Sequence, residues 1–455
     1  MYGPPPDPRQ LYAPTGVYSE PLAWLACFAI GAILAWAAGT KRPFLFIVGA
    51  TLALTTPFAA YATTYVWGQF PTIDKAGSLL FYLDGVMWRF WDPADPAIRL
   101  IGVHVGHLWI TALFDTFVPA TAAFNLQAFL NLVLGWYCAW LLLDELSGDR
   151  EVSLVLAFPF GMGLHLFRDI NWYTIEKSGV YWVPLYAWAL VKAYRLGGRW
   201  VGIAALIYVA TLFYNFYLGV LCAGIGALAL FARKRDVTLA VGASALAALP
   251  LVALQLFAMR GDGALGDAET FLTQRAALDT FELWPPKWNR LEAWRALNVV
   301  ALGFAAVGLS RRKNLWIGGV ALLFFVLALG PVHNPLYLLL FEVVPGFWRI
   351  AKPETFFHVT WLSLLVVAAR VLADAKPSRR VVAMLGALFA VAWAVSIRTH
   401  PVYPRFTEPL ELTLSEHWAR SLPGASTGSG AKGHPEGNTP KDPGPEGAAL
   451  RPGSR

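Results

Sequence analysis

The sequence is poor in charge and in cysteine. Charged residues make up only 14% of its 455 positions, while hydrophobic residues make up 57%. Because a single soluble core cannot bury so much apolar surface, the composition argues against an ordinary soluble protein and predicts that lipid covers the excess. The three cysteines, Cys27, Cys138 and Cys222, lie inside apolar runs and are odd in number, which argues against a disulfide framework or a zinc site.

The first apolar run also lacks the basic segment with which a secretory signal begins. It starts at Pro21, after a proline-rich stretch whose only basic residue is Arg9, and we interpret it as a retained span. The formal charge of +7 would suggest a nucleic-acid partner in a soluble protein. Here much of the excess positive charge lies in short hinges between apolar runs. Basic residues at such positions indicate the orientation of the helices in the membrane, so no nucleic-acid partner is expected.

Long apolar runs, by contrast, are abundant. Many reach the roughly 17 to 22 residues that cross a hydrocarbon core of about 30 Å. The sequence therefore predicts an all-α polytopic membrane protein with about twelve transmembrane helices. The least certain pair, 200–213 and 216–232, is separated only by the weak polar break Tyr214-Asn215-Phe216-Tyr217. The predicted spans are 21–39, 43–62, 121–143, 152–167, 180–196, 200–213, 216–232, 237–258, 293–310, 315–331, 355–373 and 381–397.

Basic residues in the hinges orient these helices. If the run 21–39 enters the membrane toward the cytoplasm, the basic hinges all fall on the cytoplasmic side, as the positive-inside rule requires. The hinge 144–151 is mainly acidic and fits the rule less well. The basic hinges are Lys41-Arg42, Lys192 to Arg199, Arg233-Lys234-Arg235, Arg311-Arg312-Lys313 and Arg370 to Arg380.

The same topology places the long loops outside the cytoplasm. We expect an extracytoplasmic segment at 1–20, a transmembrane domain at 21–397 and a second extracytoplasmic segment at 398–422. Within the domain, loop 63–120 is crowded with aromatic residues, which suit helices lying in the headgroup region. Residues 423–455 are rich in Gly, Pro and Ser and poor in apolar side chains, a composition that predicts disorder.

Loop 63–120 also supplies candidate chemical groups. It contains five aspartates, and Asp74 stands shortly after the span 43–62, where partial desolvation would raise the pKa of its carboxyl toward that of a useful base. For any one aspartate, an ordinary solvated loop residue is the simpler interpretation. His104 and His107, three apart, could share a helical face and ligate a metal or contact an acceptor, but no complete ligand set accompanies them.

Two other predicted outer segments carry cations. Arg168 and Lys177 lie in a short loop with two acids, where either cation would suit a phosphate and paired interfacial charges explain the loop equally well. Arg349 and Lys352 precede the span 355–373, at the depth of a lipid-linked phosphate, where isolated basic residues also snorkel. Loop carboxylates could hold Mg²⁺ or Mn²⁺, since both ions accept oxygen ligands.

Several short motifs together resemble the GT-C superfamily. They are Ala123-Phe124-Asn125-Leu126 at the start of a span, Trp182-Val183-Pro184-Leu185-Tyr186, and Val344-Pro345-Gly346-Phe347-Trp348-Arg349 with Pro353. Members of this superfamily are integral-membrane glycosyltransferases that use polyprenyl-phosphate sugars, and the sequence is most similar to the bacterial YfhO-like branch. The resemblance covers roughly residues 63–375.

This resemblance implies an activity and a set of residue roles. Sugar would pass from a polyprenyl-phosphate donor to a lipid, glycan or protein acceptor at the extracytoplasmic face of the bacterial inner membrane. Asp74, or alternatively Asp84, matches the acidic residue near the start of the first outer loop, and Arg349 matches the basic residue after the Pro-Gly-Phe segment. The candidate ligands of the donor phosphate are Arg349, Lys352, Arg168 and Lys177.

Two other classes stay open on the sequence alone. A flippase or secondary carrier would place ionisable residues near the middle of its spans, and here the centres of the clear spans are nearly free of Asp, Glu, Lys and Arg. No internal repeat is visible, which weighs further against a carrier built from inverted repeats. A non-catalytic membrane assembly subunit is compatible with every pattern above.

Overall fold

The computed structural model describes a helical chain. The described residues are 21–56, 66–67, 106–118, 120–163, 166, 178–260, 300–330, 334–344, 347, 353–399 and 406–407. The chain divides into one unit of Met1–Pro409, which contains all of them, and a second unit of Leu410–Arg455, which lies outside them. The predicted N-terminal segment 1–20 and the predicted disordered tail 423–455 therefore fall outside the described residues.

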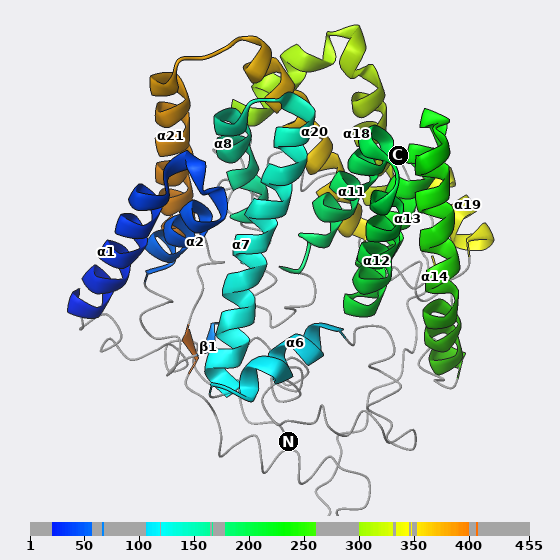
Figure 1. The fold of residues 1–455 in the computed structure, drawn as a ribbon, viewed down its shortest axis with the longest axis horizontal. Helices are drawn as coiled ribbons and strands as arrows, with labels where there is room; N and C mark the ends of the chain where they lie inside the picture. The colour runs from blue at the N-terminus through cyan, green and yellow to red at the C-terminus, as the bar shows by residue number, and fades with distance from the viewer. Residues whose placement is uncertain are drawn as a thin grey trace, which may run out of the picture. The chain divides into compact units, whose positions relative to one another are not determined.

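Every predicted span overlaps a helix (Figure 1). The helices are α1 (Pro21–Ala38), α2 (Pro43–Leu54), α7 (Ala120–Ser147), α8 (Arg150–Gly161), α11 (Trp182–Leu196), α12 (Arg199–Tyr214), α13 (Phe216–Ala229), α14 (Arg235–Arg260), an unlabelled helix at Val300–Leu309, α18 (Leu315–Ala328), α20 (Phe357–Asp374) and α21 (Arg379–Thr399).

Shorter elements join these helices. They are the helices α6 (Gly106–Asp115) and α19 (Pro335–Val343), the 3-10 turns η2 (Gly39–Lys41), η4 (Leu230–Ala232), η5 (Arg312–Asn314) and η7 (Pro353–Phe356), and the strands β1 (Val66–Trp67) and β2 (Phe406–Thr407). The two strands pair antiparallel, with Val66 opposite Thr407. This pairing brings the chain after α2 next to the chain after α21, and β1 also contacts α7.

Three of the described helices are long and apolar enough to cross a membrane. They comprise Ala122–Ser147, Arg235–Ala253 and Phe357–Asp374. Shorter apolar helices accompany them, including Pro43–Leu54 and Arg199–Tyr214. The described part is thus that of a helical membrane protein, while the count of twelve crossings stays a prediction.

The weak polar break after position 213 is a true helix boundary. Asn215 has an extended backbone, and its side-chain oxygen accepts hydrogen bonds from the backbone N–H groups of Tyr217 (2.8 Å) and Leu218 (3.4 Å). It thereby caps the N-terminus of α13, where backbone donors have no intrahelical partner. The segment 200–232 therefore contains two helices, as the sequence predicts.

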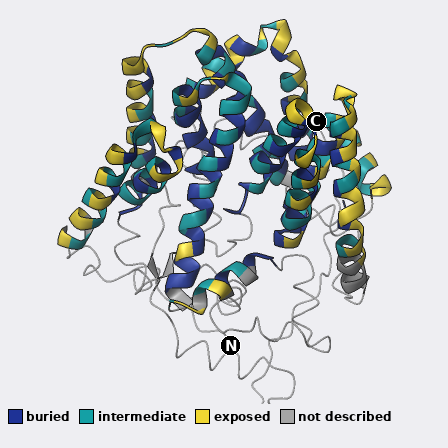
Figure 2. Ribbon diagram, in the orientation of Figure 1, coloured by how far each residue is buried: buried dark blue, intermediate teal, exposed yellow. Residues whose placement is uncertain are grey.

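Helices α7, α8 and α20 form the centre of the described core (Figure 2). Most residues of α20 are buried, from Val359 to Leu372. Helix α1 instead exposes large apolar side chains such as Leu22 and Trp36, which are 79% and 85% exposed. An apolar surface of this kind is costly in water and suits contact with lipid.

Acidic residues hold the basic hinges together at one end of the helices. Each of three carboxylates lies within ion-pair distance of at least one basic nitrogen. The nitrogen–oxygen pairs are Glu145 with Lys192 (2.5 Å) and Arg195 (2.7 Å), Asp374 with Arg311 (2.6 Å) and Lys313 (2.7 Å), and Glu151 with Arg379 (3.3 Å). We call this end of the molecule the basic end.

Two further hinges join the basic end. Arg150 donates a hydrogen bond from Nη2 to the carbonyl of Lys41 (3.1 Å), and the Lys234 Nζ lies 4.4 Å from the centroid of the Tyr194 ring. The acidic hinge 144–151 therefore lies among the basic hinges and pairs with them, which explains its composition. That the basic end faces the cytoplasm stays a prediction.

Candidate functional site

Helix α6 packs at the end of the helices opposite the basic end. It contacts the beginning of α7 and the end of α12, and Figure 1 shows it lying across α7 instead of along it. Helix α7 runs from this end to the basic end, and α12 runs the other way, ending at Tyr214. Because α6 begins at Gly106, these contacts fix where the chain re-enters the described helices after residue 105.

Tyr214 is the centre of a buried polar cluster at this end. Its side chain is 1% exposed, and its hydroxyl accepts a hydrogen bond from Nδ2 of Asn131 (3.3 Å). The same Nδ2 group donates to Oγ of Ser178 (2.8 Å), which is fully buried. These hydrogen bonds link α7 to the end of α12 and to Ser178.

His107 of α6 lies against the same tyrosine. The two rings meet edge to face with centroids 5.9 Å apart, and His107 is 3% exposed. Burial lowers the pKa of its imidazole to about 3, although a hydrogen bond with the Tyr214 backbone acts in the opposite direction. His107 is therefore neutral at physiological pH and serves as an uncharged hydrogen-bonding group.

Thr111, one turn after His107, extends the cluster along α7. Its hydroxyl donates to Oε1 of Gln127 and lies 3.3 Å from the His107 carbonyl. Gln127 is 1% exposed, and its Nε2 has no hydrogen-bond partner among the described residues. A buried amide donor of this kind costs free energy unless a further group binds it.

Two glycines allow the loop ends to approach Tyr214 closely. A Cβ atom at Gly106 would lie 2.7 Å from the Tyr214 Cα, and one at Gly179 would lie 2.5 Å from both Cζ and the hydroxyl oxygen of its ring. Because real Cβ atoms do not approach so closely, no larger side chain fits at either position without movement. Gly106 and Gly179, which are far apart in the sequence, thus both lie against Tyr214.

Most of the predicted site residues fall outside the described part of the chain. Of the eight candidates, His107 is described, and it belongs to the Tyr214 cluster. The other candidates, Asp74, Asp84, His104, Arg168, Lys177, Arg349 and Lys352, lie outside the described residues. Among the described residues, no group of three His, Cys, Asp or Glu side chains is placed to hold a metal ion.

Several of the described motif residues that suggested the GT-C resemblance are buried, whereas Leu126 and Val344 are each 37% exposed. Phe124 is fully buried and Asn125 is 1% exposed in the first turns of α7. Phe347, two residues before Arg349, packs its ring against Tyr337 (5.0 Å between centroids) and Phe356 (5.8 Å). These aromatic contacts hold Phe347 beside α19 and η7.

The low pKa of His107 predicts a pH dependence of stability. In the unfolded chain the imidazole titrates near 6.5, so below that pH the unfolded state binds a proton that the folded state excludes. The contribution of His107 to the free energy of unfolding is therefore complete above pH 6.5 and is lost as the pH decreases toward 3. Between pH 7 and pH 5 the loss is about 2 kcal/mol. In His107→Gln this loss should be absent. Thermal unfolding of both proteins across that range tests it, and parallel curves would contradict the burial of a neutral histidine.

Comparisons with known proteins show a structural likeness but no family. No family model matches the sequence, and no curated protein matches it significantly. Among solved structures, the arabinofuranosyltransferase AftD from Mycobacteria, determined by single-particle cryo-EM, aligns with a TM-score of 0.45 and 12% sequence identity. The alignment covers 78% of this chain and 27% of that one, so this chain spans about a quarter of the length of AftD. The function proposed below therefore rests on this chain's own residues.

Proposed function

We propose that this protein is a membrane glycosyltransferase of the GT-C type that acts at the end of the helices opposite the basic end. It would move a sugar from a polyprenyl-phosphate donor to a lipid, glycan or protein acceptor on the extracytoplasmic face of the inner membrane. The observation that carries the proposal is the Tyr214 cluster, which joins the ends of two loops that bear candidate catalytic groups.

The placement of these loop ends suits the reaction. The predicted loop 63–120 carries Asp74, and the predicted loop 168–179 carries Arg168 and Lys177. Gly106 of the first and Ser178 of the second both belong to the Tyr214 cluster. A base and phosphate-binding cations from separate loops can be directed at one substrate only if rigid elements hold those loops together.

In the proposed reaction the acceptor hydroxyl attacks the anomeric carbon of the sugar. Asp74, or alternatively Asp84, takes the hydroxyl proton as the new bond forms, and the bond between the anomeric carbon and the phosphate oxygen breaks. Polyprenyl phosphate leaves with the bonding electrons, and Arg349, assisted by Lys352 or Arg168, stabilises its charge. Because phosphate is a good leaving group, this scheme needs one carboxylate, whereas glycoside hydrolysis uses two.

The distribution of charge supports surface chemistry over transport. Among the described residues no Asp, Glu, Lys or Arg side chain is buried, and the ion pairs of the described helices lie at the basic end. A carrier usually places such groups near the middle of the membrane. The hydrogen-bonding groups of the Tyr214 cluster are uncharged, which is compatible with a neighbouring site for a polar substrate such as a sugar.

A reconstituted transfer assay tests the proposal. The purified chain in nanodiscs is mixed with radiolabelled polyprenyl-phosphate sugars and a membrane lipid extract as acceptor, with and without EDTA to test dependence on Mg²⁺ or Mn²⁺. We expect label to leave the donor and appear in a new product, and heat-inactivated protein to give none. Movement of intact donor across sealed vesicles without its consumption would instead identify a flippase.

A further inference from the structure

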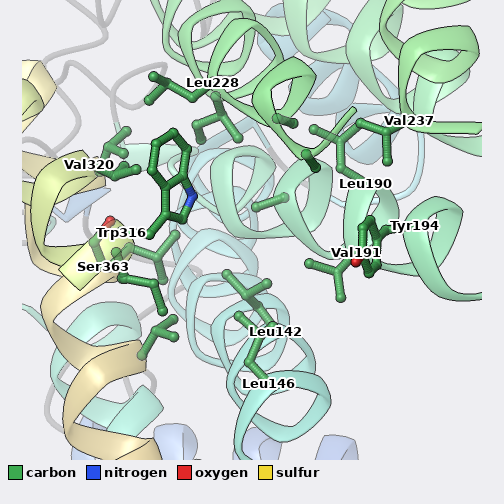
Figure 3. A pocket seen from close by; sticks show the side chains of 18 of the residues that line it. Leu142, Leu146, Leu190, Val191, Tyr194, Leu228, Val237, Trp316, Val320 and Ser363 are labelled. Atoms are coloured by element: carbon green, nitrogen blue, oxygen red, sulfur yellow. The ribbon is translucent and has the colours of Figure 1, made fainter. Parts of the chain in front are cut away.

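A cavity with a volume of about 400 Å³ opens among six helices near the basic end. It is lined by residues of α7, α11, α13, α14, α18 and α20, and Figure 3 shows its lining side chains. Small-molecule sites in proteins occupy about 300–1,000 Å³, so the space is sufficient for a ligand.

Most of the side chains that line this cavity are aliphatic. Leu142 and Leu146 of α7 face Trp316 and Val320 of α18 across it, and Val191 of α11 lies beside them (Figure 3). An apolar wall of this kind accepts hydrocarbon and offers few partners to a polar solute.

Polar groups gather at the end of the cavity that lies nearest the basic end. Arg195 and Arg370 line it there, and no acidic side chain lines it in the described part of the chain. Arg370 donates to the Leu146 carbonyl (3.3 Å) and to Oδ1 of Asn314 (3.3 Å), which are both uncharged acceptors. Arg195 pairs with Glu145, but that carboxylate also pairs with Lys192. Arg370 also interacts electrostatically with Asp374, but that carboxylate pairs with both Arg311 and Lys313. Because these groups include more cations than carboxylates, the mouth has an excess of positive charge.

The depth of the cavity matches one leaflet of a membrane. Its lining on α20 runs from Val359 to Arg370, which is about 16 Å at 1.5 Å per residue. The hydrocarbon core of a bilayer is about 30 Å thick. At the mouth, Trp316 is 57% exposed and Tyr194 is 45% exposed, as is typical of aromatic side chains at a membrane interface.

We propose that this cavity binds one anionic phospholipid from the leaflet at the basic end. One acyl chain lies among the aliphatic walls, and the phosphate lies against Arg370 and Arg195. A free anion would gain no favourable contact with the apolar walls. A neutral lipid would not offset the excess positive charge at the mouth. This inference does not depend on glycosyl transfer, because the site lies at the opposite end of the helices.

Native mass spectrometry tests the inference. The protein is extracted from vesicles of equal parts phosphatidylglycerol and phosphatidylcholine, and retained lipid is counted. We expect one retained phosphatidylglycerol, favoured over phosphatidylcholine by about tenfold. Val191→Trp, which fills the cavity, should abolish retention, whereas Val307→Trp, at a position that is 56% exposed and does not line the cavity, should preserve it.

A second pair of variants examines the charge. Arg370→Gln should remove the preference for phosphatidylglycerol, and Arg312→Gln, at an exposed position outside the cavity, should keep it. Because Arg370 also links α20 to α7 through its hydrogen bond to the Leu146 carbonyl, its loss could unfold the protein. Thermal unfolding of each variant shows whether it is folded. Equal retention of the two lipids by the wild type, or equal retention by Val191→Trp and Val307→Trp, would overturn the inference. Sugar transfer is not part of this readout.

Discussion

Replacing Asp74 with asparagine is expected to reduce sugar transfer by roughly 10²- to 10⁴-fold, the usual contribution of a positioned general base. The substitution keeps the size of the side chain and removes its ability to accept the proton of the acceptor hydroxyl. Donor binding should change little, because the donor phosphate is assigned to the cations. The measurement is the initial rate of transfer by purified protein at matched protein levels.

Asp92→Asn is the matched control for this prediction. Asp92 lies in the same loop but precedes Pro93, a pairing that indicates a turn, and its loss should leave the rate near that of the wild type. Full activity in Asp74→Asn would remove this residue from the mechanism. If Asp84→Asn were then the inactive variant, the role of the base would move to Asp84.

Gly161→Ala is expected to have the largest effect on stability. A Cβ atom on Gly161 would overlap the backbone nitrogen, Cα and Cβ of Trp136, where α8 meets α7. Trp136 cannot easily move, because its indole nitrogen donates to the Leu154 carbonyl (2.8 Å) and its ring packs against Phe158 with centroids 5.0 Å apart. The two helices must therefore separate, at a cost of about 2 kcal/mol or more.

Gly202→Ala provides the control for this helix contact. Gly202 is exposed in α12, and a Cβ atom there would meet nothing within 4 Å. The change should be neutral or slightly stabilising, because alanine favours a helix more than glycine does. Thermal unfolding in detergent compares the two variants. Equal midpoints would show that α7 and α8 do not approach each other as closely as described.

The helices were predictable because apolar runs of membrane length are a strong signal. Even the doubtful break at Asn215 was visible, since a residue that caps a helix stood between two apolar segments. The grouping of the basic hinges followed from the same pattern. The pairing of Glu145 with Lys192 and Arg195 did not, because it joins positions far apart in the sequence and only the packing of α7 on α11 brings them together.

The Tyr214 cluster was missed for a related reason. Asn131 and Gln127 are four residues apart in an apolar run, so they lie on one face of a helix. Two amide side chains in such a position indicate buried hydrogen bonds. Their partners Ser178 and Thr111 come from other segments, so neither could be named from the sequence. His107 was a candidate as a metal or acceptor ligand. The structure describes it as a buried, neutral group, and its role as a ligand stays a prediction.

A cryo-EM map of the protein in lipid with bound polyprenyl phosphate would show whether the chain has the site of a transferase. We expect phosphate density at the helix ends beside the Tyr214 cluster, in contact with Arg349 and with Asp74 facing it across the substrate site. A continuous central tunnel open to alternate sides, with Asp74 remote from the bound lipid, would contradict a transferase and indicate a transporter.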